Sequence, residues 1–254
     1  MSLTILLSPA KKLNFEAPVP ELTYREPGFW KKTTRLAKVL KKHSVKKIGE
    51  LMKLSLDLAS LNHQRYQEFE ITQTKEVSKP SMFVFNGEVY TGLDAQSYNE
   101  DDLNFADKHL RILSGLYGIL KPLDFIQPYR LEMGTKLTVA QHKNLYEFWN
   151  KDICNDINTN TLANDTIINL ASNEYFKVTK HKELLARIIT PVFKDFKNGD
   201  YKTIMVYAKK ARGQMAKYIV KNKISDPEML KAYNVEGYEF NVNLSSSNEW
   251  VYTR

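Results

Sequence analysis

The sequence predicts one domain of mixed α/β (α+β) class. Short apolar runs that are typical of strands alternate with segments of helical periodicity along the whole chain. No internal repeat, low-complexity tract or linker divides this pattern. With 254 residues, the chain is long enough to bury a substantial core. We therefore expect residues 1–254 to form a single domain.

The N-terminal part begins with a predicted buried strand, Leu3–Leu7, which ends at Ser8 and Pro9. An irregular, proline-bearing stretch follows, and a helix is expected over residues 28–43. Apolar residues at helical spacing form one side of this helix, while lysines and an arginine cover most of the rest. The helix is therefore expected to be amphipathic and strongly basic.

Two short helices are expected over residues 44–66. Ser44 is a suitable N-cap for the first helix, and Ser55 marks a break or a second cap. A helical hairpin of this kind can contact a DNA backbone through amides at its turn. The glycine-rich joint of DNA-binding hairpins is missing here, so ordinary packing of two helices is the other interpretation.

The middle of the chain predicts a strand over Met82–Phe85, a turn at Asn86 and Gly87 with extended chain after it, and a helix over Asn99–Leu113. Arg111 would then lie near the end of that helix. The C-terminal half predicts helices over 144–157, near 174–178 and over 212–221, a short helix opened by Asp226, and strands over 166–170, 187–193 and 201–207.

The charge balance is basic, since 37 Lys and Arg stand against 29 Asp and Glu, which gives a net charge of +8 and a pI of about 9.2. Such a chain is attracted to polyanions, which include nucleic acid, phosphate-bearing ligands and acidic membrane surfaces. A solvated, lysine-rich surface without a partner is the alternative.

The composition indicates a cytoplasmic protein without a membrane partner. Cys154 is the only cysteine, which excludes an intramolecular disulfide and a four-thiolate metal site and fits a reducing compartment. The apolar run near the N-terminus is too short for a signal peptide. No apolar run approaches the roughly 18 residues that a spanning helix needs.

Motifs for common cofactors and metals are missing from the sequence. There is no Walker-type loop, dinucleotide glycine fingerprint, nucleophile elbow or HExxH zinc helix. The five histidines are scattered and do not pair with cysteine or carboxylates at metal-ligand spacing. We therefore expect no cofactor and no metal site, and direct binding of iron is disfavoured.

Three cationic stretches are candidates for a site: SPAKKL at 8–13, QPYRLEMG at 127–134 and YAKKARG at 207–213. The first and the last each follow a predicted strand. Loops beyond strand ends are where open α/β sheets place their sites, so these stretches are expected to meet. The result would be one anion-binding cleft lined by Lys11, Lys209, Lys210 and Arg212.

The stretch from Gly115 to Gly134, GLYGILKPLDFIQPYRLEMG, combines glycines and prolines with aromatic and charged side chains. Rigid, irregular chain of this kind is typical of the wall of a cleft. An arginine and tyrosines on such a wall suit a phosphate and a stacked base, which makes Tyr117, Tyr129 and Arg130 candidate binding residues. In the alternative, Tyr117 fills the core and Arg130 pairs with Glu132 or Asp124.

Five sequence blocks occur in fixed order: SPAKKL, FNGEVYTGL, LRILSGLYGILKPLDFIQPYRLEMG, NLASNEYF and VYAKKARG, with SSSNEWVY near the end. In these blocks the chain resembles the YaaA family of peroxide-stress proteins over nearly its whole length, although Lys12 stands where many relatives carry Thr. The resemblance implies a fold unlike the common superfolds, with a central mixed sheet, flanking helices, a positively charged cleft and a helix-hairpin-helix-like element. It also implies a cytoplasmic response to hydrogen peroxide that lowers free iron, and a proposed binding of DNA.

Two functional hypotheses follow. In the first, lysines of the helix over 28–43 and of the hairpin neutralise phosphates of duplex or bubble DNA, and the cleft holds a backbone or a flipped nucleotide. In the second, the chain is an enzyme that acts on a small anionic or nucleotide-like substrate in the same cleft. Lys11 or Lys209 would be its base or nucleophile, because neighbouring cations lower the pKa of a lysine, and Tyr117 or Tyr129 would assist while Arg130 holds the anion. The sequence predicts no oligomeric state.

Overall fold

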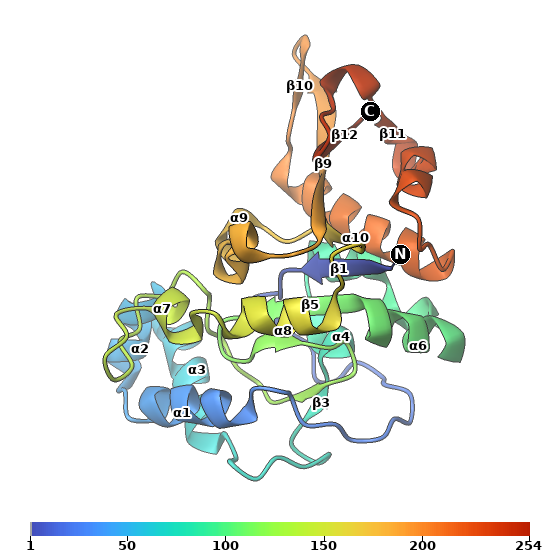
Figure 1. Ribbon diagram of the computed structural model, residues 1–254. Coiled ribbons are helices and arrows are strands. Elements are labelled where there is room, and N and C mark those ends of the chain that lie inside the picture. Colours follow the sequence, from blue (N-terminus) through green and yellow to red (C-terminus); the bar gives the residue numbers. More distant parts are fainter. Residues whose placement is uncertain (1) are drawn as a thin grey trace.

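The computed structural model describes residues 2–254 and has an eight-stranded mixed sheet at its centre (Figure 1). The strand order is β11-β12-β9-β8-β1-β5-β6, and β10 also pairs with β9. The strands are β1 (Leu3–Leu7), β5 (Leu110–Ser114), β6 (Gly118–Leu120), β8 (Thr166–Asn169), β9 (Arg187–Lys197), β10 (Asp200–Lys202), β11 (Glu239–Phe240) and β12 (Glu249–Thr253). Two further pairs are β2 (Lys12–Leu13) with β4 (Phe85–Asn86) and β3 (Lys79–Pro80) with β7 (Phe125–Ile126). The predicted mixed α/β class is confirmed.

The centre of the sheet is parallel and buried. β1 lies between β8 and β5, and Ile5 is the register partner of both Ile168 and Leu110. β9 is also parallel to β8 and β12, whereas β6, β10 and β11 pair with their neighbours in antiparallel fashion. Parallel strands covered on both faces need continuous apolar runs. The predicted strand Leu3–Leu7 is confirmed for this reason.

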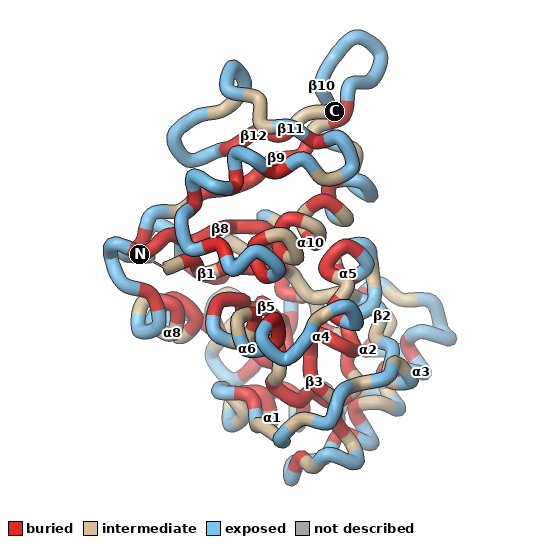
Figure 2. The backbone as a smooth tube through the Cα atoms, turned by 90° about the vertical axis from the view of Figure 1, so that its right-hand side faces the viewer, coloured by how far each residue is buried: buried red, intermediate tan, exposed pale blue. Residues whose placement is uncertain are grey.

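Helices lie on both sides of the sheet: α8 covers one face, and α5 and α10 lie on the other (Figures 1 and 2). The helices are α1 (Trp30–Lys41), α2 (Val45–Met52), α3 (Leu56–Glu68), α4 (Ser81–Val84), α5 (Glu88–Leu93), α6 (Glu100–His109), α7 (Leu145–Trp149), α8 (Asp152–Asn160), α9 (Asn173–Phe176) and α10 (Met205–Lys221). Short 3-10 segments lie at 95–97, 177–179, 181–183, 227–232, 235–237 and 242–244. Asp226 caps the segment at 227–232 as predicted, since its side chain accepts a hydrogen bond from the Glu228 amide.

The helices α5 and α10 cross at very close range. A Cβ atom on Gly213 of α10 would lie 1.8 Å from the Val89 carbonyl oxygen, and one on Gly92 of α5 would lie 2.2 Å from the Lys210 carbonyl oxygen. Only glycine fits at both positions, because any side chain would meet backbone of the facing helix. The two glycines therefore set the distance between α5 and α10.

One apolar cluster joins the sheet to these helices and forms the core. It includes β1, β5 and β8 together with the inward sides of α1, α6 and α10 (Figure 2). β9 continues beyond its neighbours, and its outer half with β10, β11 and β12 forms an arm that projects from the body (Figure 1). Within residues 2–254, no helix is long and apolar enough to cross a membrane.

Several predicted elements in the middle of the chain are wrong. Most of Met82–Phe85 is the short helix α4, and the segment after Gly87 is the helix α5 rather than extended chain. The predicted helix Asn99–Leu113 ends at His109, and Leu110–Ser114 is the strand β5, so Arg111 lies on a strand. The apolar residues after His109 are compatible with a helix or with a strand by their intrinsic propensity. Pairing with β1 selects the strand.

Three C-terminal predictions are also wrong. The strand expected over 201–207 ends at Lys202, and α10 already begins at Met205 rather than near Arg212. This segment has residues with high helix propensity, and its buried positions recur at helical spacing along α10. The helix expected over 144–157 is broken at Asn150, whose φ is 42°. The predicted strands over 166–170 and 187–193 are present as β8 and β9.

Candidate functional site

The helices α1 and α2 carry an unusual share of the charge. Residues 30–53 contain nine lysines and arginines and one carboxylate, Glu50. This excess equals the net charge of +8 of the whole chain, so the other residues are neutral on balance. The predicted basic helix over 28–43 is thus confirmed as α1, and counting charges by segment would have revealed from sequence alone that α2 extends it.

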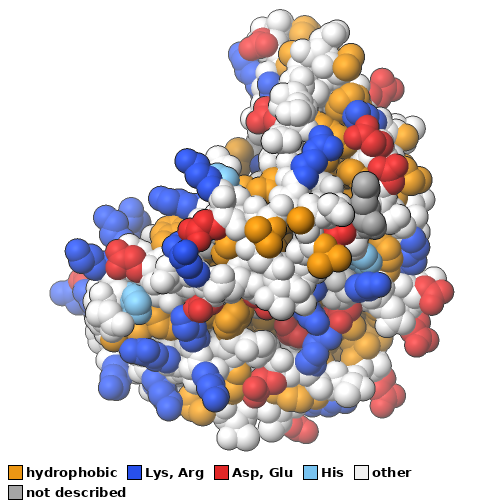
Figure 3. Space-filling model, in the orientation of Figure 1, with side chains coloured by type: hydrophobic (Ala, Val, Ile, Leu, Met, Phe, Trp, Pro, Cys, Tyr) orange, Lys and Arg blue, Asp and Glu red, His pale blue; other side chains and the backbone are white. Residues whose placement is uncertain are grey.

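Four of these cations form a stripe along α1. Lys31, Arg35, Lys38 and Lys42 recur at helical spacing and line a shallow hollow of about 290 Å³. Within residues 2–254, none of the four makes an ion pair. Figure 3 shows Lys and Arg side chains gathered over the side of the molecule where α1, α2 and α7 lie.

Lys32 is the inward-facing exception on α1. Its ammonium pairs with Asp152 of α8, donates to the Phe148 carbonyl at 3.0 Å and lies over the Trp149 ring at 5.7 Å. These contacts fix α1 against α7 and α8. The stripe of free cations is therefore held on a helix with a defined orientation.

The two short helices expected over residues 44–66 are present as α2 and α3, which pack as a pair. The Ser44 side chain caps α2 by accepting from the Lys47 amide, and Ser55 occupies the N-cap position of α3. Three residues join the helices, and Lys53 takes the left-handed conformation with φ at 53°. A Cβ atom on Gly49 would lie 3.3 Å from the Ala59 Cβ, which shows how closely α2 approaches α3. The geometry is that of a compact helical pair; its binding of DNA stays a prediction.

The two predicted site tyrosines lie in the core. Tyr117 has no exposed surface, and its hydroxyl accepts from the Gln127 amide at 2.9 Å. Tyr129 is 4% exposed and hydrogen-bonds Ser114 at 2.7 Å. Burial raises the pKa of both phenols well above the ordinary value. The structure thus shows the packing that the sequence offered as the alternative for Tyr117, and both rings are closed to a ligand in this arrangement.

Glu132 brings two of the predicted site residues together. Its carboxylate accepts from Arg130 at 3.0 Å and from Lys11 at 2.8 Å, so the stretches at 8–13 and 127–134 meet. The Arg130 Nε is buried without a hydrogen-bond partner among residues 2–254. The hydroxyl of Tyr66 donates to the Arg130 carbonyl at 2.6 Å and anchors this segment to α3. The cluster has two cations and one carboxylate and therefore retains positive charge.

The remaining predicted site residues lie on α10, inside a helix rather than on a loop after a strand. Lys209 is exposed, and Lys210 pairs with Glu236 at 2.6 Å. Arg212 is half-buried on the side of α10 that carries the buried residues Ala208 and Ala216. It has no ion pair or side-chain hydrogen bond within residues 2–254, and desolvation lowers the pKa of its guanidinium.

A chain of contacts connects α10 with the end of β1. α10 packs on α5 as described, and the Tyr90 hydroxyl of α5 donates to the Ser8 carbonyl at 3.0 Å. The Ser8 hydroxyl in turn contacts Ser172, which begins α9 after β8. The structure therefore places SPAKKL, α5 and α9 together at the carboxyl end of β1 and β8 and packs α10 against α5.

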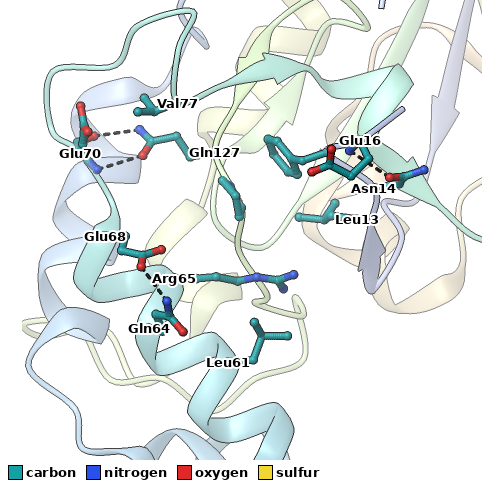
Figure 4. A pocket seen from close by; sticks show the side chains of 12 residues that line it. Leu13, Asn14, Glu16, Leu61, Gln64, Arg65, Glu68, Glu70, Val77 and Gln127 are labelled. Carbon is teal, nitrogen blue, oxygen red and sulfur yellow. Dashed lines mark hydrogen bonds between the residues drawn. The ribbon is translucent and has the colours of Figure 1, made fainter. Parts of the chain in front are cut away.

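A second hollow lies between α3 and the segment at 13–16 (Figure 4). It measures about 570 Å³, and Arg65 extends across it from α3. Desolvation and the nearby charge of Arg130 lower the pKa of Arg65. Three carboxylates, Glu16, Glu68 and Glu70, also line the pocket, so its charge does not favour an anion. None of the predicted site residues lines this pocket, and nothing in the sequence pattern distinguishes Arg65.

Metal ligands do not gather in the part of the chain that the structure describes. Within residues 2–254, no group of three or more His, Cys, Asp or Glu side chains is placed to hold a metal ion. The single thiol, Cys154, is buried on α8, and burial raises its pKa, with a smaller contribution from Glu183.

Comparison with known proteins gives one consistent result. A family model described as peroxide stress protein YaaA matches residues 3–244. A UPF0246 protein of Colwellia psychrerythraea is 48% identical over 252 residues, which cover 98% of each chain. A UPF0246 protein of Aliivibrio fischeri strain MJ11 is 50% identical over 98% of this chain and 97% of the relative, and one of Ralstonia pickettii is 50% identical over 98% of both.

Proposed function

This chain belongs to the peroxide stress protein YaaA family, and we propose that it serves the response to peroxide by binding DNA through α1 and α2. The concentration of the whole net charge in residues 30–53 carries the proposal. A duplex is a dense array of phosphates, and cations that neutralise phosphates release bound counterions. Side chains without acidic partners, such as those of the stripe on α1, can do this without first breaking an ion pair.

The hairpin of α2 and α3 extends the proposed surface. Its first helix continues the basic segment through Lys46 and Lys47, and its joint presents Lys53. The first amides of α3 have no partner within their own helix and carry a partial positive charge, which suits a phosphate. We propose that the DNA backbone, of a duplex or of a bubble, lies along α1 and reaches this joint.

Salt dependence tests the proposal. If Lys31, Arg35, Lys38 and Lys42 each neutralise one phosphate, they contribute about −3.6 to the slope of log affinity against log salt concentration. Changing all four to Gln should therefore flatten the slope by about 3.6. The loss of duplex affinity relative to the unaltered protein should then be on the order of 100-fold larger in 50 mM salt than in 200 mM salt. Fluorescence anisotropy of labelled duplex and bubble DNA across a salt series measures both quantities.

A matched control carries the same loss of charge elsewhere. Lys108, Lys121, Lys136 and Lys182 are exposed and make no ion pair within residues 2–254. Their change to Gln should leave most of the affinity and the slope in place. Equal effects of the two sets would show that only total charge matters, and absence of binding by the unaltered protein would end the DNA proposal.

Protection from peroxide is proposed to occur in the cytoplasm, with the fall in free iron as an indirect consequence of DNA binding. The compartment rests on the single cysteine and the family, and the iron effect rests on the resemblance to the family. Cells that lack the protein and receive the four-Gln variant should keep high free iron under peroxide, measured by electron paramagnetic resonance of chelated iron. Full restoration by that variant would separate the iron effect from the basic helices.

A second candidate function is an enzyme that acts on a small anionic or nucleotide-like substrate. Arg212 favours it, because a desolvated guanidinium without a carboxylate partner is suited to an anion. Lys11 and Lys209 are the candidate bases in this reading. Arg212→Gln should weaken binding of inorganic phosphate and of a nucleoside monophosphate about tenfold or more in calorimetry, whereas Lys108→Gln should not. Equal affinities in both variants would remove this support.

A further inference from the structure

The hairpin of β9 and β10, residues 194–202, has the geometry of a rigid ribbon. Its strands pair in antiparallel register, with Tyr201 opposite Phe196 and Asp200 opposite Lys197. The two-residue turn at Asn198 and Gly199 has φ of 55° and 80°, as a type I′ turn requires. The ribbon projects from the body at the outer end of the arm (Figure 1). Its side chains are therefore presented to solvent in a defined arrangement.

Aromatic rings are exposed on this ribbon. Phe196 is 60% exposed and Tyr201 is 36% exposed, and their centroids lie 5.2 Å apart with the rings at 66°. Tyr207 at the start of α10 is 47% exposed, with the Arg254 guanidinium 5.0 Å from its centroid. These rings have free faces that the core does not use. A free aromatic face is the surface on which an unpaired base stacks.

The charge around the rings favours an anionic partner. Lys194, Lys197, Lys202 and Lys209 make no ion pair within residues 2–254. Of the two carboxylates between residues 194 and 209, Asp195 is already bound by Arg254 at 2.6 Å and by Tyr238 at 2.9 Å. Asp200 is the remaining negative charge on the ribbon. A second copy of this chain would bring like-charged lysines together, which opposes self-association through this surface.

We propose that the β9–β10 hairpin, together with Tyr207, binds single-stranded nucleic acid. Bases stack on Phe196 and Tyr201, and the adjacent lysines contact the phosphates. This inference rests on the proposed function. It assigns the binding of duplex and the binding of single strands to two surfaces at different ends of the molecule. The stripe on α1 contacts duplex backbone, whereas the hairpin contacts bases that have left a duplex, as in a bubble.

The test compares three labelled DNAs: a 20-nucleotide thymidine oligomer, a duplex and a duplex with a central bubble. Phe196→Ala with Tyr201→Ala should lower affinity for the thymidine oligomer about 5- to 150-fold for each stacked base that is lost. Affinity for the duplex should stay within twofold. The matched control is Val242→Ala with Leu244→Ala, which removes apolar side chains that are 71% and 43% exposed elsewhere on the arm and should change neither affinity.

Different results would contradict the inference for the β9–β10 hairpin and the proposal that α1 binds duplex DNA. Unchanged binding of the thymidine oligomer by the double Ala variant overturns the hairpin inference, while salt-dependent duplex binding through α1 would still stand. Loss of duplex binding to the same extent also overturns it, because the two surfaces would not be separate. A smaller sedimentation coefficient of the variant would assign the rings to contact between copies of the chain. Failure of the unaltered protein to bind duplex, with binding of the oligomer retained, would overturn the role of α1 and keep that of the hairpin.

Discussion

Asp102 is expected to be a major electrostatic link between α6 and α10. Asp102 is 4% exposed, and its carboxylate accepts from Lys221 at 2.6 Å and from Lys223 at 2.5 Å. It also accepts from the Asn99 amide at 3.1 Å, which completes the capping box at the start of α6. Desolvation raises the pKa of Asp102, but the hydrogen bonds from the two lysines and from Asn99 outweigh it and lower the pKa to about 2.

Asp102→Asn removes the charge and keeps an oxygen that can accept from the Asn99 amide. The folded-state pKa lies below the unfolded value of 3.8, so the charge stabilises the fold above pH 3.8 and this stabilisation is lost as the pH falls toward 2. The difference in pKa corresponds to about 2 kcal/mol at pH 7. Both lysines are about one-third exposed, so their ammonium groups can be hydrated once the charge of Asp102 is removed. The loss of stability on Asp102→Asn should therefore stay near 2 kcal/mol and not reach the roughly 3–5 kcal/mol of breaking a fully buried pair.

Thermal unfolding measures the effect. For a chain of this size, about 2 kcal/mol corresponds to a fall in Tm of about 4–8 °C at pH 7. The difference between Asp102→Asn and the unaltered protein should be roughly halved at pH 3, because the unfolded chain then binds the proton. Asp101→Asn is the matched control, since Asp101 is exposed in the same helical turn and makes no ion pair within residues 2–254. A fall below 2 °C, or one that is the same at pH 3 as at pH 7, would refute the reasoning.

Three further outcomes are expected. Gly213→Ala should lower the free energy of unfolding, measured by urea denaturation, by about 1–3 kcal/mol, because the new Cβ would meet the Val89 carbonyl oxygen and push α5 away from α10. An unchanged free energy of unfolding would mean that the two helices can separate without cost. Glu132→Gln should cost about 1–3 kcal/mol because Arg130 loses its only carboxylate within residues 2–254, whereas Lys11→Gln at the exposed side of the same cluster should cost under about 1 kcal/mol. Cys154 should resist alkylation by iodoacetamide until the chain is unfolded, since its thiol is buried and its pKa is raised; rapid labelling of the folded protein would contradict this.

Local signals account for the parts of the fold that could be predicted. Leu3–Leu7 is a run of leucine and β-branched residues, so it could be recognised as a buried strand without knowing its neighbours. Ser44 marks the start of α2 because an N-cap acts on the next few amides of its own helix. The family resemblance likewise depends on ordered blocks of sequence and not on how those blocks meet in the fold.

The candidate site depends on contacts that no local pattern contains. The alternative for Arg130, pairing with Glu132, could be named from sequence, but Lys11 as the second partner of that carboxylate could not. The sequence pattern predicts that Arg212 begins a helix just after a strand over 201–207. Its half-buried position follows from the packing of α10, which begins seven residues before it.

The sequence alone determined the mixed class, the first strand, the basic helix and the size of the net charge, because each depends on composition or on residues close in the chain. Tertiary structure decided the state of Leu110–Ser114, where pairing with β1 prevailed over helix continuation. It also decided where free charge and free aromatic faces lie, since exposure of Phe196 and pairing of Lys210 are set by segments distant in sequence. Burial and ion pairing are properties of the folded neighbourhood, and for that reason the aromatic surface of the β9–β10 hairpin emerges only from the structure.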